Sequence, residues 1–159
     1  MESKKTNIFF KYSKKIKIIS IIGVILCLIG IADATYLTVA HYSTTVTLAC
    51  PTKGIINCEK VTNSSYSEVF GIPVAIYGLL FFIGMFILQL PMMWTSTNKN
   101  IRYFRLFYSI AGLLSVFWFV YVEFQRLDAI CLYCTLVHIL TFGLFVTTTV
   151  GMSIIRTEE

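Results

Sequence analysis

The sequence has few charged residues, which make up only 13% of its 159 positions. Hydrophobic residues make up 57% and the mean hydropathy is +0.77, so a water-soluble globular domain is excluded as the leading interpretation. The basic residues lie outside the apolar stretches and form no basic face interleaved with aromatic residues, so nucleic-acid binding is not expected. The chain also shows no internal repeat, low-complexity tract or lipidation signal.

The sequence does contain long runs of apolar residues. A bilayer has a hydrocarbon core of about 30 Å and needs about 20 residues of helix to cross it. Four such windows cover residues 18–40, 72–94, 103–122 and 129–155. We therefore predict an all-α integral membrane protein, a bundle of four transmembrane helices that forms one membrane domain over residues 1–159.

The Lys and Arg residues gather on one side of this four-span arrangement. They precede the first span, lie in the 95–105 connection or follow the fourth span, apart from Lys53, Lys60 and Arg126. By the positive-inside rule, both termini and that connection are predicted to be cytoplasmic. The protein is then a multi-pass protein of the cell membrane whose 41–71 loop faces the oxidising, extracytoplasmic side, or the lumen of the endoplasmic reticulum in a eukaryote.

The first apolar segment has a second interpretation as a cleavable signal peptide, because it follows a lysine-rich start and contains Ala32-Asp33-Ala34. Apolar residues resume after Asp33, which favours a membrane span. Asp33 would then lie near the outer end of the helix, as a solvated interfacial carboxylate or as a proton relay.

The 41–71 loop is rich in Thr, Ser, Asn and Gly, so it is expected to begin as irregular chain. Its later part, residues 64–70, places Tyr66, Val69 and Phe70 among small polar residues. This pattern predicts a short amphipathic helix on the membrane surface.

Two cysteines form a Cys-Leu-Tyr-Cys motif, Cys131 to Cys134, at the outer start of the fourth span. We expect Asp128 to cap this helix, which would make Cys131 its third residue. Unpaired amides and the helix dipole stabilise a thiolate there and activate it for exchange, and two sulfurs at this spacing can form a disulfide. Half of a zinc site is the alternative, and it would need two more ligands.

Cys50 and Cys58 lie in the outward loop with Pro51 and Gly54 between them, so they can pair with each other. A static staple of the loop is one interpretation of this pair in an oxidising compartment. The other is electron exchange with the second pair, which opens on the same face. Cys27 lies within the first span and is expected to be an inert apolar filler.

The cysteines and the residues around them resemble those of the vitamin K epoxide reductase family. The resemblance rests on the stretch from Cys58 through Ser64 and Pro73 to Gly78, and on Cys-Leu-Tyr-Cys further along the chain. Ala-Asp-Ala-Thr-Tyr-Leu in the first span is similar to the first helix of the family. The resemblance implies a four-helix membrane bundle that holds a quinone beside the Cys-x-x-Cys motif, here in a short form without a fused thioredoxin-like domain.

The resemblance also implies roles for individual residues. Cys50 and Cys58 match the shuttle pair of the family, Cys131 and Cys134 match its active-site pair, and Ser64 matches the loop Ser or Thr placed over the quinone.

Two positions depart from the animal enzymes of the family. His138 stands where they have a tyrosine, and their second-helix asparagine has no evident equivalent, since Gln89 is the only amide in that region. His138 follows Cys134 by one helical turn. It can bind a quinone oxygen or supply a proton, or it can bond to a neighbouring helix.

Together these features predict a quinone-linked thiol/disulfide oxidoreductase that supports disulfide formation. A separate thioredoxin-like or DsbA-like protein would reduce the loop pair, and Cys58 would then attack Cys131. Cys134, freed by that attack, would pass electrons to a quinone of the menaquinone, ubiquinone or vitamin K type. The alternatives are a vitamin K epoxide or quinone reductase proper, a membrane protein whose outward cysteines bind zinc or copper, and a non-catalytic bundle; the leading prediction includes no metal site.

Overall fold

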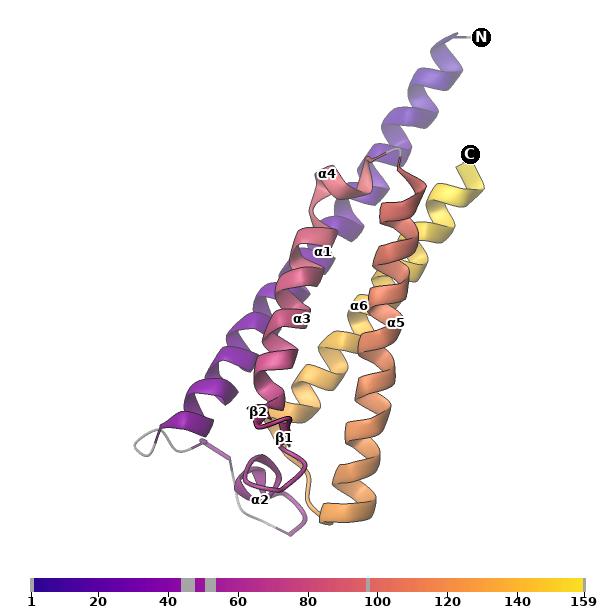
Figure 1. The fold of residues 1–159 in the computed structure, drawn as a ribbon. Coiled ribbons are helices and arrows are strands. Elements are labelled where there is room, and N and C mark those ends of the chain that lie inside the picture. The colour runs from indigo at the N-terminus through magenta and orange to yellow at the C-terminus, as the bar shows by residue number, and fades with distance from the viewer. Residues whose placement is uncertain (1, 44–47, 51–53, 97, 159) are drawn as a thin grey trace.

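Four long helices run side by side in the computed structural model, which describes residues 2–43, 48–50, 54–96 and 98–158 (Figure 1). The elements follow one another as α1 (Glu2–Tyr42), α2 (Cys58–Thr62), β1 (Glu68–Val69), β2 (Ile72–Pro73), α3 (Val74–Gln89), α4 (Pro91–Trp94), α5 (Lys99–Val122), the π-helix η1 (Glu123–Leu127) and α6 (Leu132–Glu158). The short elements α2, β1 and β2 cover one end of the bundle. The element α4 and both ends of the chain lie at the other end.

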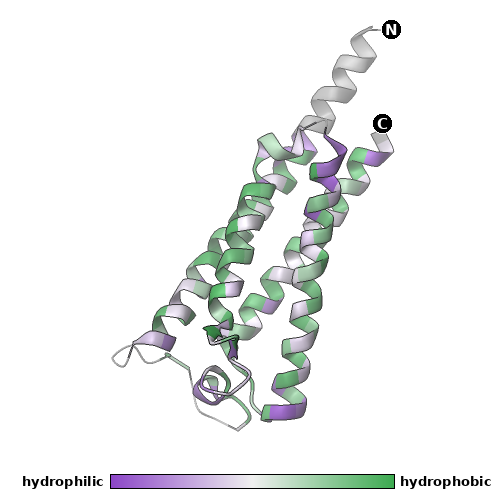
Figure 2. Cartoon of the chain, in the orientation of Figure 1, coloured by the Kyte–Doolittle hydropathy of each residue, from purple (hydrophilic) through white to green (hydrophobic). Residues whose placement is uncertain are grey.

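Three of the helical segments are long and apolar enough to cross a membrane: Lys14–Tyr42, Lys99–Leu127 and Leu132–Thr157. They correspond to three of the predicted spans. Hydrophobic residues follow the length of the helices, and hydrophilic residues gather toward their ends (Figure 2). The protein is therefore mostly helical, with an apolar belt suited to lipid.

The predicted span over residues 72–94 is not one continuous helix. It starts as the strand β2, continues as α3 with 16 residues, and breaks at Leu90, whose ψ of 142° is extended. The break has a simple cause, because the residue before a proline avoids the helical conformation, and here Pro91 follows and begins α4.

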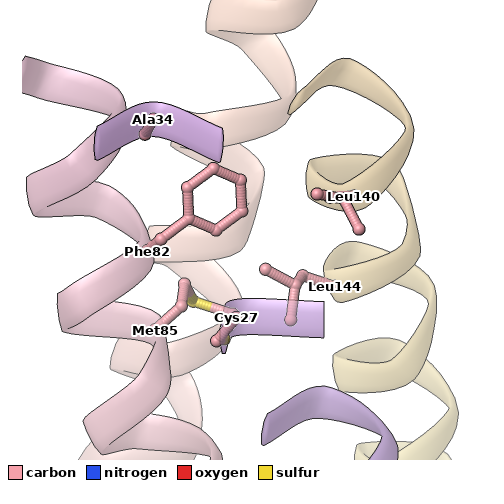
Figure 3. Packing of buried hydrophobic residues seen from close by; sticks show 6 residues of the cluster. All are labelled: Cys27, Ala34, Phe82, Met85, Leu140 and Leu144. Carbon is pink, nitrogen blue, oxygen red and sulfur yellow. The ribbon is translucent and has the colours of Figure 1, made fainter. Parts of the chain in front are cut away.

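The helix α1 packs against both α3 and α6, and α5 packs against α6. The helices α3 and α5 meet over a smaller area, where the rings of Phe81 and Tyr108 stack with their centres 5.2 Å apart. Buried side chains from α1, α3 and α6 meet in one cluster (Figure 3), which consists of Cys27, Ala34, Phe82, Met85, Leu140 and Leu144. Gly30 allows the close approach of α1 and α3, since a Cβ there would lie 2.4 Å from the ring of Phe82. Cys27 thus lies in the core, as expected for an apolar filler.

A polar network holds the α4 end of the bundle together. The side chain of Gln89 is fully buried; it donates a hydrogen bond to Thr148 at 3.0 Å and accepts one from the indole of Trp94 at 2.9 Å. The guanidinium of Arg105 lies 3.7 Å from the centre of the Trp94 ring. Gln89, the one amide of α3, therefore joins helices at the end opposite the cysteine motif.

The short helix of the loop is α2, not the predicted segment at residues 64–70. Asn57 caps α2, because its side chain accepts a hydrogen bond from the N–H of Lys60 at 2.9 Å. Residues 64–70 instead form turns that lead into the hairpin of β1 and β2. Phe70 and Gly71 make this turn with φ of 55° and 73°, a conformation that reverses the chain and excludes a helix.

Candidate active site

The loop carries a disulfide between Cys50 and Cys58, whose Cα atoms are 6.1 Å apart. Cys58 is the first residue of α2 and is fully buried. Pro51, which the sequence suggested as part of the chain reversal, lies outside the described residues; Gly54 has a positive φ of 62°.

The loop is docked on the segment that leads into the cysteine motif. The N–H of Asn57 donates to the carbonyl of Ile130 at 3.1 Å, and the N–H of Ile130 donates to the carbonyl of Ile55 at 2.8 Å. Ile56 and Ile130 form a parallel bridge in this way. Cys58 directly follows Asn57 and Cys131 directly follows Ile130, so the docking brings together the backbone segments that carry one cysteine of each pair.

Two tyrosines hold the chain just before Cys50. The N–H of Ala49 donates to the phenol oxygen of Tyr36 at 3.3 Å, and the phenol of Tyr133 donates to the carbonyl of Ala49 at 3.3 Å. The two tyrosine rings pack with their centres 5.1 Å apart. Because Tyr133 lies inside the Cys-x-x-Cys motif, the motif itself holds the loop disulfide in place.

The motif lies at the start of α6, but not in the predicted register. Cys131 precedes the helix and caps it: its sulfur accepts a hydrogen bond from the N–H of Cys134 at 3.3 Å, and its carbonyl accepts one from the N–H of Thr135 at 2.9 Å. Asp128 does not cap α6. It adopts a left-handed conformation and ends the preceding π-helix, while the bridge at Ile130 keeps the following residues extended.

Cys131 and Cys134 are both free thiols in this structure. A hydrogen bond from the side chain of Cys134 lowers the pKa of the Cys131 thiol from its ordinary value. The N–H of Cys134 acts in the same direction, while burial and the negative charge of Glu123 oppose it. Cys131 is therefore prepared to be a thiolate, the form that takes part in disulfide exchange.

A cavity of about 830 Å³ opens beside the motif, walled by α1, α3, α5 and α6 and closed at one end by the loop. Aromatic and aliphatic side chains make up most of the wall, among them Phe81, Phe82, Trp118, Phe119 and Val137. Cys134, rather than Cys131, lines it, together with Ser64, Glu123 and His138. A largely apolar cavity of this size with a few polar groups suits a flat, apolar organic molecule.

Comparison with protein families gives a direct match to this arrangement. Residues 21–149 match the model of the Vitamin K epoxide reductase family. The chain belongs to this family. The match includes all four cysteines of the loop and the motif, and it confirms the resemblance seen in the sequence. As a vitamin K epoxide reductase family member with three long apolar helices, the protein is a membrane oxidoreductase, and members of this family use quinones.

The two other residues that the resemblance singled out in this family member both reach the cavity. Ser64 lies in the wall, and its hydroxyl donates to the carbonyl of Val61 at 2.8 Å. His138 lies one turn beyond Cys134, and within the described part of the chain its imidazole has no hydrogen-bond partner. The predicted alternative, a bond from His138 to a neighbouring helix, is therefore not seen among these residues, and the imidazole faces the cavity unpaired.

The alternative function, binding of zinc or copper, requires several ligand side chains close together. Among the residues that the structure describes, no three His, Cys, Asp or Glu side chains lie together as a metal ion would need. Cys50 and Cys58 are bonded to each other, so their sulfurs do not offer free thiolates.

Sequence reasoning missed three residues of this site in the vitamin K epoxide reductase family member. Tyr36 and Tyr133 belong to the segments that carried the resemblance, yet nothing in the sequence shows that they meet at Ala49. Glu123 is a lone acid just after the third apolar window, and it looks like an ordinary interfacial charge. The one feature of the sequence that could have singled out Glu123 is its closeness to the cysteine motif. Its burial depends on the packing of η1 and cannot be read from the sequence.

Proposed function

We propose that the protein is a quinone-linked thiol/disulfide oxidoreductase. The observation that carries the proposal is that the two cysteines of the motif have different surroundings. Cys131 is buried at the point where the loop disulfide docks, while Cys134 lines the apolar cavity. Electrons can therefore enter through one sulfur of the motif and leave through the other.

The relay starts in the loop. A thiolate of a reduced thioredoxin-like or DsbA-like partner attacks the disulfide at Cys50, and Cys58 leaves as a thiolate. Resolution of the mixed disulfide by the second thiol of the partner gives the partner a disulfide and leaves both loop cysteines reduced. The hydrogen bonds of Ile130 with Asn57 and Ile55 support the next step, since they hold the backbone at Cys58 beside the backbone at Cys131.

Exchange then moves the electrons into the motif. When the motif is a disulfide, Cys58 attacks the sulfur of Cys131, and Cys134 leaves as the second thiol. Cys50 resolves the mixed disulfide, so the loop pair is oxidised again and Cys131 is released. The reduced motif then forms the Cys131–Cys134 disulfide again, and a quinone bound in the cavity would accept its two electrons and two protons and become a hydroquinone.

Several residues fit a quinone in this cavity. The unpaired imidazole of His138 can hydrogen-bond a quinone oxygen, and Cys134 lies one turn away on the same wall. Ser64 encloses the loop side, with its hydroxyl hydrogen already directed to Val61. Vitamin K epoxide itself is not proposed as the substrate, for two reasons. This chain has His138 at the position of the tyrosine in the animal enzymes. Its one amide in α3, Gln89, forms hydrogen bonds with Thr148 and Trp94 at the end of the bundle opposite the cavity.

We further propose that residues 1–159 form one membrane domain with four crossings, the fourth made by the short helix α3. The loop end would face the extracytoplasmic side, because most Lys and Arg residues lie toward the opposite end. This places the cysteines in the compartment where disulfides persist.

The function is tested with the purified protein in detergent, a reduced thioredoxin-like protein as the electron donor and a quinone analogue as the acceptor. Quinone absorbance should fall in proportion to donor oxidation. Cys134→Ala should abolish this reaction, and Cys27→Ala should leave it unchanged because Cys27 lies in the core. Full activity of Cys134→Ala would refute the proposed mechanism.

A further inference from the structure

A buried carboxyl group lies beside the cysteine motif. Glu123 is the first residue of η1, is 5% exposed, and lines the same cavity as Cys134 and His138. Its carboxylate lies near Cys131 and interacts electrostatically with the backbone N–H and the thiol of that residue. A π-helix in place of the last α-helical turn is often found at functional sites, and here it forms the segment that begins with this side chain.

The surroundings of Glu123 do not suit a permanent negative charge. Within the described residues no Lys or Arg forms an ion pair with it, and the cavity wall is mostly apolar. Its negative charge opposes ionisation of Cys131, which the hydrogen bond from Cys134 favours. A thiolate and a carboxylate side by side in a buried site repel each other, so a proton on Glu123 removes this repulsion.

We propose that Glu123 holds the proton that Cys131 gives up and releases it to a quinone oxygen when the motif is oxidised. This inference rests on the proposed function. It assigns the carboxyl group as a proton donor in the cavity and extends the roles of the four cysteines.

Protons and electrons balance in both directions. The reduced site holds a Cys131 thiolate, a Cys134 thiol and a protonated Glu123. Oxidation forms the sulfur–sulfur bond and transfers two electrons to the quinone, while one proton from Cys134 and one from Glu123 complete the hydroquinone. On reduction by the loop dithiol, the two protons of Cys50 and Cys58 return to Cys134 and Glu123.

Other titratable and charged groups around Glu123 come from each element packed near it. In the cavity wall, α6 contributes Cys134 and His138, α1 contributes His41, and Cys131 precedes α6. Asp33 of α1 is buried as well, not solvated as one of the two expectations had it, and its charge acts on Cys134 as that of Glu123 does. The helix α2, which packs against η1, carries the exposed side chains of Glu59 and Lys60, and η1 itself carries the exposed Arg126. Glu59, Lys60 and Arg126 are exposed to solvent, so Cys131, Asp33 and the groups of the cavity are the ones that can exchange protons with Glu123.

A proton count tests the proposal without any quinone. The full chain with Cys50→Ser and Cys58→Ser is reduced at the motif and then oxidised by ferricyanide, which accepts electrons but no protons. A pH-indicator dye in weakly buffered detergent at neutral pH reports the protons released. We expect two protons per motif oxidised in the parent protein and one in Glu123→Gln, which has the same shape but holds no proton to give.

Matched variants separate a proton-holding role from a structural one. Glu123→Asp keeps a carboxyl group and should still release two protons, and Glu59→Gln, an exposed position on α2, should also release two. In the wild-type background, Glu123→Gln should reduce the quinone analogue about 100-fold more slowly, the size of a general-acid contribution. Release of two protons by Glu123→Gln would overturn the proposal.

The outcomes also distinguish this inference from the function on which it rests. If the wild-type protein reduces no quinone analogue while the proton count differs as expected, the proposed function fails and Glu123 still holds the proton. If the wild-type protein reduces the analogue and Glu123→Gln is as fast as Glu59→Gln, the inference alone is wrong.

Discussion

Tyr133, which lies between the two cysteines of the motif, donates a hydrogen bond to the carbonyl of Ala49, the residue before Cys50. Together with the bond from Ala49 to Tyr36 and the bridge between Ile56 and Ile130, it fixes the loop disulfide at both of its ends. The loop pair and the motif are thus parts of one docked unit.

Removal of the Tyr133 hydroxyl should slow exchange between the two pairs. A neutral hydrogen bond contributes about 1 kcal/mol, so Tyr133→Phe should lower the rate of electron transfer from the loop to the motif about fivefold. The rate can be followed by quenching with an alkylating reagent and resolving the redox states by mass. Tyr103→Phe is the matched control, because Tyr103 is 65% exposed and lies near the start of α5, far along the chain from the cysteine motif. Equal rates in the two variants would mean that this hydrogen bond does not position the loop.

The loop pair should matter most for a large electron donor. Cys50→Ala should block reduction by a thioredoxin-like protein but leave part of the activity with dithiothreitol, because a small dithiol can reach the motif without the loop. Cys131→Ala should abolish activity with both donors, since Cys134 then lacks its partner sulfur. Quinone reduction with each donor in turn provides the measurement. An equal loss with both donors in Cys50→Ala would identify the loop disulfide as a structural staple.

The thiol of Cys131 should ionise below the ordinary thiol pKa of about 8.5, because Cys134 hydrogen-bonds to its thiolate. Its thiolate is then fully present above the lowered pKa and is lost as the pH falls through that value. Cys134→Ala removes the side-chain bond and should move the midpoint to higher pH, whereas Cys134→Ser keeps a donor and should move it less. Ultraviolet thiolate absorbance against pH gives the midpoints. A midpoint that is the same in all three proteins would contradict this assignment.

Gly30 should be intolerant of a methyl group. A Cβ at this position would lie 2.4 Å from the ring of Phe82, so Gly30→Ala forces α1 and α3 apart and should destabilise the fold by about 1–3 kcal/mol. Gly78→Ala is the control, since nothing lies within 4 Å of its Cβ position. Thermal unfolding in detergent should give a clearly lower Tm for Gly30→Ala only. A Tm unchanged by Gly30→Ala would show that α1 and α3 do not pack this closely.

Hydropathy was sufficient to predict the long helices, because lipid-facing and core-facing residues are both apolar over a length set by the bilayer. The break at Leu90 carried a local signal in Pro91, but the apolar run continues across it and hides the change of direction. The capping residue Asn57 also indicated the short helix of the loop. The amphipathic pattern of residues 64–70 was given more weight, so the helix was predicted too far along the chain.

The register of the motif could not be predicted in the same way. Asp128 is a good helix cap by type, yet it ends η1, because Ile130 is held extended by a bridge to Ile56 that comes from distant sequence. The four cysteines were recognisable because few residues share their chemistry. Glu123 was not, because an acid near the end of a helix is exposed in most proteins and only the packing of the whole site shows that it is buried.

As the proposed fourth crossing, the helix α3 has a consequence for the lipid around it. Its 16 residues rise about 24 Å, less than the hydrocarbon thickness of about 30 Å. A bilayer accommodates such hydrophobic mismatch by thinning locally, at a cost of fractions of a kcal/mol per ångström. Because α3 forms one wall of the cavity, the thinned patch would lie beside the site. Catalysis should therefore depend on membrane thickness, and short-chain lipids should favour it over long-chain lipids.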